Sequence, residues 1–376
     1  MTRAAIINAF DPETYKGGIE TFILSLKALL TERNIRVDTH SISPAPTLPV
    51  KPFPFKSLSK VVPEFLLNCF MMGRAFSEIE KDYDLVISNN FYGLGYYSPK
   101  VKSFNVYHST HAVYADALKG KIPDSDYREL KYLFGHMGDR MSGRGKIKIA
   151  VSESVRDELR EYYNFKNISV VNHGIDTDFY KKMEDVKLLR RKWDISDNAF
   201  AGLFAGRWET GKGIDIVEDV IKSHPDTIWL LAVGSSECNL SNLPNVRVIK
   251  DADKEAMREL YSLSDFMLFP SYYEGFGLVI AEAMACSLPV ICTEVGVAKD
   301  LLRYPALKKL ILPIRSNPEM VNEINDRISF LREKPDERTE ITSMGRSIIE
   351  RDYSMALWKD NMAAALGLNP NYAKSS

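Results

Sequence analysis

The segment Ser271–Cys292, SYYEGFGLVIAEAMACSLPVIC, places two glutamates and two glycines around the expected start of a helix. Gly275 and Gly277 leave the backbone open there, and the free N–H groups and dipole of a helix N-terminus favour an anion such as a phosphate. Glu274 lies just before the helix and Glu282 about two turns into it. Both carboxylates can therefore face one cleft at the carboxyl end of a parallel sheet, where α/β proteins bind ligands. A helix cap and a solvated helix acid are the alternative roles for them.

The segment LFAGRWETGKGI, which begins at Leu203, carries two cations on a glycine-rich loop after an expected strand. Its Gly-x4-Gly-Lys spacing resembles a phosphate-binding P-loop, but Gly213 stands where a serine or threonine would bind magnesium. The spacing therefore argues against a nucleoside triphosphatase. Arg207 and Lys212 remain as two cations that could stabilise a diphosphate without a metal. Exposed charges on a surface turn are the alternative.

Glycines and histidines follow two expected strands in the first half of the chain. Gly17 and Gly18 follow the first strand and would let the backbone approach a ligand at the start of a helix, although a glycine pair is also a common turn. The chain has no G-x-G-x-x-G, so a dinucleotide oxidoreductase lacks its fingerprint. His108 and His111 stand at the end of the fourth strand, a position that favours a functional site over a purely structural role. No third ligand is close to them in the sequence, so no metal site is predicted.

Short apolar strands alternate with helical patterns in both halves, which is typical of βαβ units and doubly wound parallel sheets. We therefore expect an α/β protein with two Rossmann-like domains that face a cleft. The expected strands are 4–9, 37–41, 85–88, 103–108, 147–151, 168–172, 201–205, 229–233, 246–249, 266–269 and 289–292. The expected helices are 18–33, 65–80, 153–162, 215–222, 254–264, 278–285 and 318–332.

The domain boundary is expected near 176–187, where NHGIDTDFY gives way to a charged helix. The first domain would span 1–176 and the second 177–353. A last helix, 354–368, follows the completed second set of elements and would cross back onto the first domain, so that 354–376 joins it.

Composition limits the class of protein. The chain has 376 residues, of which 45% are hydrophobic and 26% charged, as in ordinary globular proteins. A net charge of −1 argues against a nucleic-acid partner, whose binding protein would be strongly basic. Four dispersed cysteines form neither a disulfide scaffold nor a metal motif, so a reduced, cytoplasmic setting is expected.

Membrane contact is a separate question. No apolar run reaches the roughly 18 residues of a membrane span, and the N-terminus reads as a buried strand rather than a signal peptide. Residues 43–63 hold six prolines together with Lys51, Lys56, Lys60, Phe53 and Phe55. A stiff loop that leads to a core helix is one interpretation, and a basic-aromatic contact of residues 51–72 with an anionic membrane is the other.

Together these motifs resemble a known family. E-G-F-G-L-x-x-x-E, preceded by FPSYY, resembles the paired-glutamate motif of retaining glycosyltransferases of family 4, and AGRWETGKG resembles their donor loop. KGGIE resembles their N-terminal glycine loop, and VSESVRDELREYY and VVNHGIDTDFY resemble their interdomain strand and Asn-Gly-x-Asp turn. The motifs occur in the family's order across residues 4–300. One departure is His173, which separates Asn172 from Gly174.

The resemblance implies a GT-B fold, a nucleotide-sugar donor bound mainly by the second domain, and no essential metal or other cofactor. Glu274 and His108 would lie at the reacting sugar, and His111 on the acceptor side. Arg207 and Lys212 would hold the diphosphate, and Glu282 the ribose hydroxyls. The remaining donor contacts would come from Gly17, Gly18, Gly275, Phe276, Gly277 and Leu278.

The resemblance also implies the reaction: transfer of a hexose from a nucleoside diphosphate sugar, UDP before GDP, to an acceptor hydroxyl with retention of configuration. The acceptor would be a glycan or lipid-linked molecule in surface polysaccharide, lipopolysaccharide or glycolipid assembly, at the inner face of the membrane. A sugar-nucleotide epimerase on the same fold and a non-enzymatic nucleotide-sugar binding protein are the alternatives.

Overall fold

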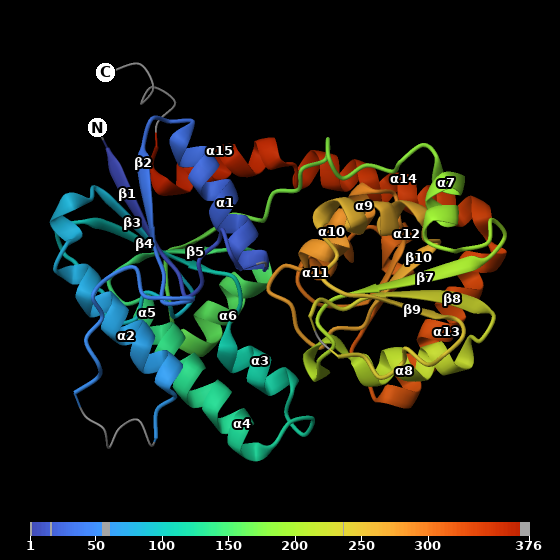
Figure 1. Ribbon diagram of the computed structural model, residues 1–376, viewed down its shortest axis with the longest axis horizontal. Coiled ribbons are helices and arrows are strands. Elements are labelled where there is room, and N and C mark those ends of the chain that lie inside the picture. Colours follow the sequence, from blue (N-terminus) through green and yellow to red (C-terminus); the bar gives the residue numbers. More distant parts are fainter. Residues whose placement is uncertain (1, 16, 55–60, 236, 369–376) are drawn as a thin grey trace. The chain divides into compact units, whose positions relative to one another are not determined.

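The computed structural model describes residues 2–15, 17–54, 61–235 and 237–368. They divide into two compact units (Figure 1). Unit 1 comprises Met1–His173 with Trp358–Ser376, and unit 2 comprises Gly174–Leu357. The boundaries expected from the sequence were after 176 and before 354.

Unit 1 is built on a six-stranded parallel sheet in the order β2-β1-β3-β4-β5-β6. β3 is buried along its whole length, as a central strand covered on both faces must be. Because all strands run the same way, their carboxyl ends share one edge, and the residues after β1, β3 and β4 lie along it. The strands are β1 (Arg3–Ile7), β2 (Arg36–His40), β3 (Leu85–Asn89), β4 (Lys102–Tyr107), β5 (Ile147–Ala150) and β6 (Ile168–Val170).

The helices of unit 1 cover both faces of this sheet (Figure 1). α6 begins at a cap in which the Ser152 hydroxyl accepts a hydrogen bond from the Val155 N–H, and it ends at Asn164 in the left-handed region. The helical elements are α1 (Gly18–Thr31), α2 (Glu64–Ser77), η2 (Glu80–Asp82), α3 (His111–Ala117), α4 (Asp124–Arg128), the π-helical segment η3 (Glu129–Asp139), α5 (Arg140–Ser142) and α6 (Glu153–Tyr163).

The last helix, α15 (Met355–Leu366), begins in unit 2 and continues in unit 1. Trp358 packs edge-on against Phe22 of α1, with ring centroids 5.8 Å apart. Lys359 Nζ lies 2.6 Å from a carboxylate oxygen of Glu32. The prediction that the C-terminal helix returns to the first domain is confirmed.

Unit 2 repeats the architecture with a second six-stranded parallel sheet in the order β12-β11-β10-β7-β8-β9. Its strands are β7 (Phe200–Ala205), β8 (Thr227–Ala232), β9 (Val246–Ile249), β10 (Phe266–Phe269), β11 (Val290–Thr293) and β12 (Ile311–Leu312). Its helical elements are α7 (Val186–Lys192), η4 (Thr210–Lys212), α8 (Ile214–Ser223), α9 (Lys254–Leu263), α10 (Leu278–Ala285), α11 (Val297–Leu301), α12 (Pro305–Lys308), α13 (Asn317–Glu333) and α14 (Pro335–Asp352).

The predicted α/β class with two doubly wound parallel sheets is confirmed, and three predicted elements, β9, β10 and α10, have the expected bounds. Two long helical elements were missed, η3 and α14. The segment of α14 is rich in charge, and its apolar residues form only a narrow stripe that includes Ile341, Ile348 and Ile349. Gly345 on this stripe lets the helix approach Met284 of α10, whose Cε would lie 3.1 Å from an added Cβ. None of the described helices combines the length and hydropathy needed to cross a bilayer.

Candidate donor and acceptor sites

Two loops meet at the carboxyl edge of the unit 2 sheet, one after β7 and one after β10. Gly213 has φ +69°, and a Cβ there would lie 2.2 Å from the Pro270 carbonyl oxygen, so this approach requires glycine. The Tyr272 N–H donates to the Gly211 carbonyl at 3.0 Å, and the Ser271 hydroxyl oxygen lies 3.1 Å from the same carbonyl oxygen. These contacts join the loop that carries Lys212 to the loop that leads into α10.

Lys212 and Glu274, one from each loop, form an ion pair. Lys212 Nζ lies 2.5 Å from Glu274 Oε1, and the two side chains are 18% and 14% exposed. The Ser271 hydroxyl donates to the same oxygen at 2.8 Å. The sequence pointed to both charged residues but not to their direct contact. Because both hydrogen bonds end on Oε1, Oε2 is left to accept a hydrogen bond from a ligand hydroxyl.

The sequence predicts an anion site at the start of α10, and the backbone of the turn before this helix determines its geometry. Gly277 caps the helix with φ +87°, and the helix begins at Leu278. The side chain of Phe276 is buried, and its carbonyl accepts a hydrogen bond from the Val297 N–H at 2.7 Å. Phe276 therefore fixes the turn through packing and backbone contacts, and Gly275 is buried beside it.

Glu282 lies on the same helix and is held by tyrosines. The Tyr261 hydroxyl donates to its Oε2 at 3.0 Å, and the Tyr180 hydroxyl also hydrogen-bonds to the carboxylate. Burial raises the pKa of Glu282, and the two hydrogen bonds partly oppose this rise. Neither tyrosine was predicted from the sequence, although Tyr180 ends the segment NHGIDTDFY.

Arg207 differs from the other predicted donor residues because its side chain is mostly in solvent. It is 67% exposed and pairs with Glu209, with 3.0 Å between a guanidinium nitrogen and a carboxylate oxygen. The structure does not bring it against Lys212. An exposed ion pair is weak, so it does little to hold Arg207 in this rotamer.

In unit 1, the predicted glycine turn at Gly17 lies next to the buried side chain of Glu20. A Cβ on Gly17 would lie 2.4 Å from Glu20 Oε2, while Gly18 begins α1. The Asn8 side-chain amide donates to Glu20 Oε1 at 3.1 Å, and burial raises the pKa of this carboxyl. The acid beneath the turn was not singled out from the sequence.

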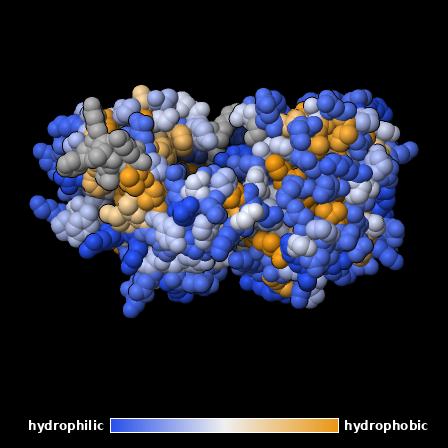
Figure 2. All heavy atoms as spheres, turned by 90° about the horizontal axis from the view of Figure 1, so that it is seen from below, coloured by the Kyte–Doolittle hydropathy of each residue, from blue (hydrophilic) through white to orange (hydrophobic). Residues whose placement is uncertain are grey.

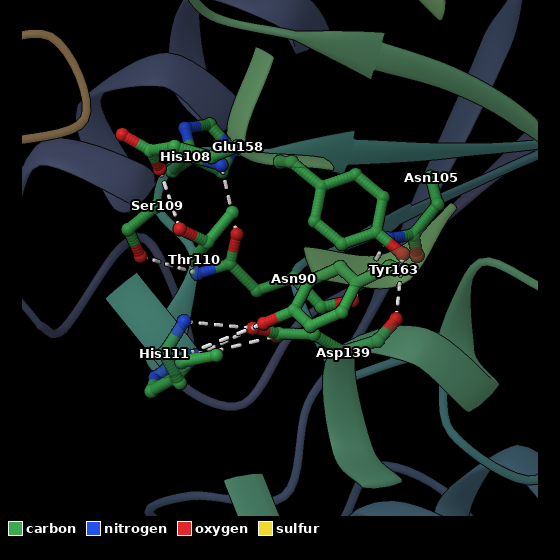
Figure 3. Close-up of polar contacts among 11 residues, drawn as sticks. Asn90, Asn105, His108, Ser109, Thr110, His111, Asp139, Glu158 and Tyr163 are labelled. Carbon is green, nitrogen blue, oxygen red and sulfur yellow. Dashed lines mark hydrogen bonds and ion pairs between the residues drawn. The ribbon is translucent and has the colours of Figure 1, made fainter. Parts of the chain in front are cut away.

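His108 lies at the carboxyl end of β4 and is buried. Its backbone N–H donates to Asn90 Oδ1 at 2.8 Å, and its Nε2 lies 2.9 Å from Asn89 Oδ1 (Figure 3 shows His108 and Asn90). An amide oxygen only accepts, so Nε2 carries the proton and Nδ1 is an acceptor. Nδ1 has no hydrogen-bond partner among the described residues. Burial, followed by the charge of His173, holds the pKa of His108 well below its usual value, so the ring is neutral near pH 7.

His111 begins α3 and faces Asp139 of η3 (Figure 3). Its backbone N–H donates to Asp139 Oδ2 at 2.9 Å, and its Nδ1 lies 3.1 Å from the same oxygen. The Tyr163 hydroxyl donates to this carboxylate as well, at 2.9 Å. Beside this group, the Thr110 hydroxyl donates to Glu158 at 2.5 Å. The sequence singled out His111 but missed Asp139 and Glu158, which lie far from it in the chain.

Segment 51–72 is only partly described, and Phe55, Lys56 and Lys60 lie outside the described residues. In α2, Leu66, Leu67, Cys69 and Met72 are buried in the core of unit 1, whereas Val61 is 69% exposed. Figure 2 shows that hydrophilic residues cover most of this face of unit 1, with hydrophobic residues exposed in a few places. Most apolar residues of α2 thus pack into the protein.

The described residues offer no cluster of metal ligands. Among them, no group of three or more His, Cys, Asp or Glu side chains is arranged to hold an ion. Asp176 and Asp253 have structural roles: Asp176 accepts a hydrogen bond from the Phe179 N–H at 3.0 Å, and Asp253 caps α9.

Two family models match the chain in succession. Residues 16–179 match Glycosyltransferase Family 4, and residues 185–347 match Glycosyl transferases group 1. The two six-stranded parallel sheets agree with these two matches. The chain belongs to the GT-B glycosyltransferases that these two family descriptions cover.

Three proteins that resemble this chain share between 20% and 29% of their aligned residues with it. A D-inositol 3-phosphate glycosyltransferase of Catenulispora acidiphila is 25% identical over 327 residues, 74% of each chain. The alpha-galactosylglucosyldiacylglycerol synthase of Streptococcus pneumoniae is 29% identical over 164 residues, 38% of this chain and 44% of that protein, so the match spans less than half of the relative. The structure of sucrose-phosphate synthase from Thermosynechococcus elongatus superposes with a TM-score of 0.74 at 20% identity, covering 97% and 98% of the two chains, which shows a common fold.

Proposed function

We propose that this glycosyltransferase moves a hexose from a nucleoside diphosphate sugar to an acceptor hydroxyl with retention of configuration. UDP-sugars are the first candidates for the donor and GDP-sugars the second. The observation that carries the proposal is the Lys212–Glu274 pair beside the N-terminus of α10. A cation suited to a diphosphate and a carboxylate suited to sugar hydroxyls are held together there.

The leaving diphosphate gains negative charge as the glycosidic bond to the donor breaks. Lys212 and the N-terminus of α10 would stabilise this charge, with Arg207 joining after it leaves Glu209. Preorganised cations and dipoles are effective because they need little reorganisation during the reaction. Glu274 would keep Lys212 in place through Oε1 and accept a hydrogen bond from the transferred sugar on Oε2, so its role is to orient the sugar.

Glu282 would bind the ribose of the donor. The hydroxyl of Tyr261 holds the carboxyl group through Oε2, and the group would accept hydrogen bonds from the ribose hydroxyls. Gly275 to Leu278 would supply backbone contacts to the phosphate and sugar. Gly17 and Gly18, at the start of α1, remain predicted contacts of the donor phosphate.

His108 would contact the reacting sugar, since its Nδ1 is a buried acceptor that can take a hydrogen bond from a hydroxyl. The reaction would occur on the front face of the sugar, where the departing phosphate oxygen accepts the proton of the acceptor hydroxyl. His111 would lie on the acceptor side. No group of this chain then needs to carry a covalent sugar.

The acceptor is proposed to be a glycan or lipid-linked molecule of surface polysaccharide or glycolipid assembly, and the reaction is proposed to need no metal. The Streptococcus pneumoniae relative is an alpha-galactosylglucosyldiacylglycerol synthase, which supports the glycolipid class. A cytoplasmic location at the inner face of the membrane fits such an acceptor, and residues 51–72 remain the proposed contact.

Ligand-induced thermal stabilisation tests the donor site. UDP, GDP, ADP and their sugar conjugates are added singly to the purified protein in the presence of EDTA. A nucleotide that binds the folded state must raise the melting temperature by mass action. We expect one nucleotide class to do so, and Lys212→Ala to abolish the shift while Arg191→Ala, a change of an exposed cation, retains it. The absence of any shift, or a shift that both variants retain, would contradict the assigned donor site.

Product analysis separates the proposed transferase from the two alternatives. A transferase releases nucleotide only together with a glycosylated acceptor whose anomeric configuration matches the donor. An epimerase yields an isomerised nucleotide sugar without an acceptor, and a binding protein shows a thermal shift without turnover.

A further inference from the structure

Unit 1 has an open groove beside η3, α5 and the amino end of β5. It has a volume of about 800 Å³ and is bounded by the second half of η3, by α5, by the turn before β5 and by the end of α6. Gly145 and Lys148 lie at or just before the amino end of β5. His108 follows the carboxyl end of β4, so the groove lies toward the opposite edge of the same sheet.

Three cations line this groove: Arg140, Arg144 and Lys148. No Asp or Glu is among the residues that line it, and none of the ion pairs between described residues involves these three cations. Asp139 precedes Arg140 in the chain, but it is buried and takes its hydrogen bonds from His111 and Tyr163. The groove thus gathers positive charge in a chain whose net charge is −1.

Aromatic and apolar side chains stand between these charges. Tyr132 and Met141 line the groove and are each 52% exposed. Lys148 Nζ lies 5.0 Å from the centroid of the Phe165 ring, which also lines it. Exposed rings and a thioether beside guanidinium groups suit a ligand that has an apolar part as well as an anionic one.

Phosphate is the anion that this set of cations matches best. The guanidinium group is planar, always charged and able to donate two parallel hydrogen bonds to phosphate oxygens. Three neighbouring cations without an acid repel one another, and a phosphate with up to two negative charges relieves that repulsion.

We propose that this groove is a second anion site, which binds the phosphate group of an amphiphilic phosphate ester through Arg140, Arg144 and Lys148. None of these three cations is among the residues assigned to the donor site or to the His108–His111 cluster. The ester can be a lipid headgroup or a soluble molecule, because both present the same phosphate beside an apolar group.

Binding of two probes tests the proposal and separates these sources. One arm measures binding of phenyl phosphate by calorimetry, and the other measures co-flotation with vesicles of phosphatidylglycerol and phosphatidylcholine against vesicles of phosphatidylcholine alone. The test variant combines Arg140→Gln, Arg144→Gln and Lys148→Gln. The control combines Arg191→Gln, Lys308→Gln and Lys334→Gln, which removes the same charge from exposed positions of unit 2.

We expect the unmodified protein to bind at least one probe and the test variant to lose about tenfold or more of that affinity, while the control retains it. Binding of phenyl phosphate supports a soluble ester, and binding of anionic vesicles alone supports a headgroup. The proposal fails if neither probe binds, or if the control loses as much affinity as the test variant. Circular dichroism and a cooperative thermal unfolding transition like that of the unmodified protein show that the test variant is folded. Should it not fold, Arg144→Gln alone replaces it, since Arg144 is exposed.

Discussion

At the scale of single residues, the candidate site consists of charged groups that already have partners. Lys212 is paired with Glu274, and Glu282 is hydrogen-bonded to tyrosines. These contacts hold each side chain in one rotamer before any ligand arrives. Preorganisation of this kind lowers the entropic cost of binding and places charge where the reaction needs it. Substitutions at these positions should therefore affect turnover or ligand affinity more than folding.

Glu274→Gln tests the role of this carboxylate. The substitution keeps the size of the side chain but removes the charge that holds Lys212, and we expect turnover to fall by about a hundredfold or more. The melting temperature should change little, since the pair stands at the edge of the sheet. Steady-state kinetics and calorimetry measure the two effects, with Glu255→Gln, at an exposed helix position, as the control. Turnover within a factor of three of the unmodified enzyme would remove Glu274 from the mechanism.

Tyr261→Phe tests how Glu282 is positioned. Loss of the 3.0 Å hydrogen bond should weaken nucleotide binding by roughly fivefold to tenfold. This hydrogen bond lowers the pKa of Glu282, so its loss should move the pH dependence of binding to higher pH, which lost packing alone would not do. Calorimetric titrations from pH 5 to 8 measure both effects. Tyr127→Phe, which removes a 2.9 Å hydrogen bond to Asp116 in unit 1, is the matched control and should leave both unchanged.

At the scale of elements, the donor site depends on two loops that only glycine allows to meet. Gly213 adopts φ +69° against the Pro270 carbonyl, and this contact sets Lys212 beside Glu274. Both loops start at the carboxyl edge of the sheet, and the contacts between them fix the relative positions of Lys212 and Glu274. A change at Gly213 should thus act on the site through the backbone.

Gly213→Ala should destabilise unit 2 and weaken donor binding together. An alanine at this position would incur two costs. The left-handed φ alone costs about 1–2 kcal/mol, and the alanine Cβ would also overlap the Pro270 oxygen. Gly234→Ala is the control, because Gly234 has φ +60° with nothing within 4 Å of the added Cβ. Urea unfolding and nucleotide titration compare the two variants. If Gly213→Ala and Gly234→Ala lose equal amounts of stability and of nucleotide affinity, then the positive φ alone, and not the close approach of the loops, matters at Gly213.

The sequence predicts elements better than it predicts contacts. α10 and β10 were predicted with the observed bounds because a buried strand, a glycine turn and an apolar helix follow one another there. η3 and α14 were missed because their apolar stripes are narrow, and a π-helical segment does not follow the helical period of 3.6 residues. Asp139 and Tyr261 were missed because each acts on a residue that is distant in the chain, at His111 and Glu282.

At the scale of the whole molecule, each unit is a complete doubly wound sheet, and the chain returns from the second unit to the first through α15. His173 is the last residue of unit 1 before the chain enters unit 2. It is buried, with its ring centroid 5.5 Å from that of His108. Two neighbouring buried imidazoles link the stability of unit 1 to pH.

Acid should therefore destabilise unit 1 as the pH falls below about 6.5, the ordinary histidine pKa. Burial lowers the pKa of His173 to about 4, and it lowers that of His108 as well. Below the ordinary histidine pKa of about 6.5 the unfolded chain binds protons that the folded chain does not. The free energy of unfolding should then fall between pH 6.5 and about 4 for His173, by up to about 3 kcal/mol. Urea unfolding at a series of pH values measures this slope. His173→Gln should flatten it, whereas His136→Gln, at a half-buried position of η3, should change it less; equal slopes in the unmodified protein and the His173 variant would show that this histidine does not couple stability to pH.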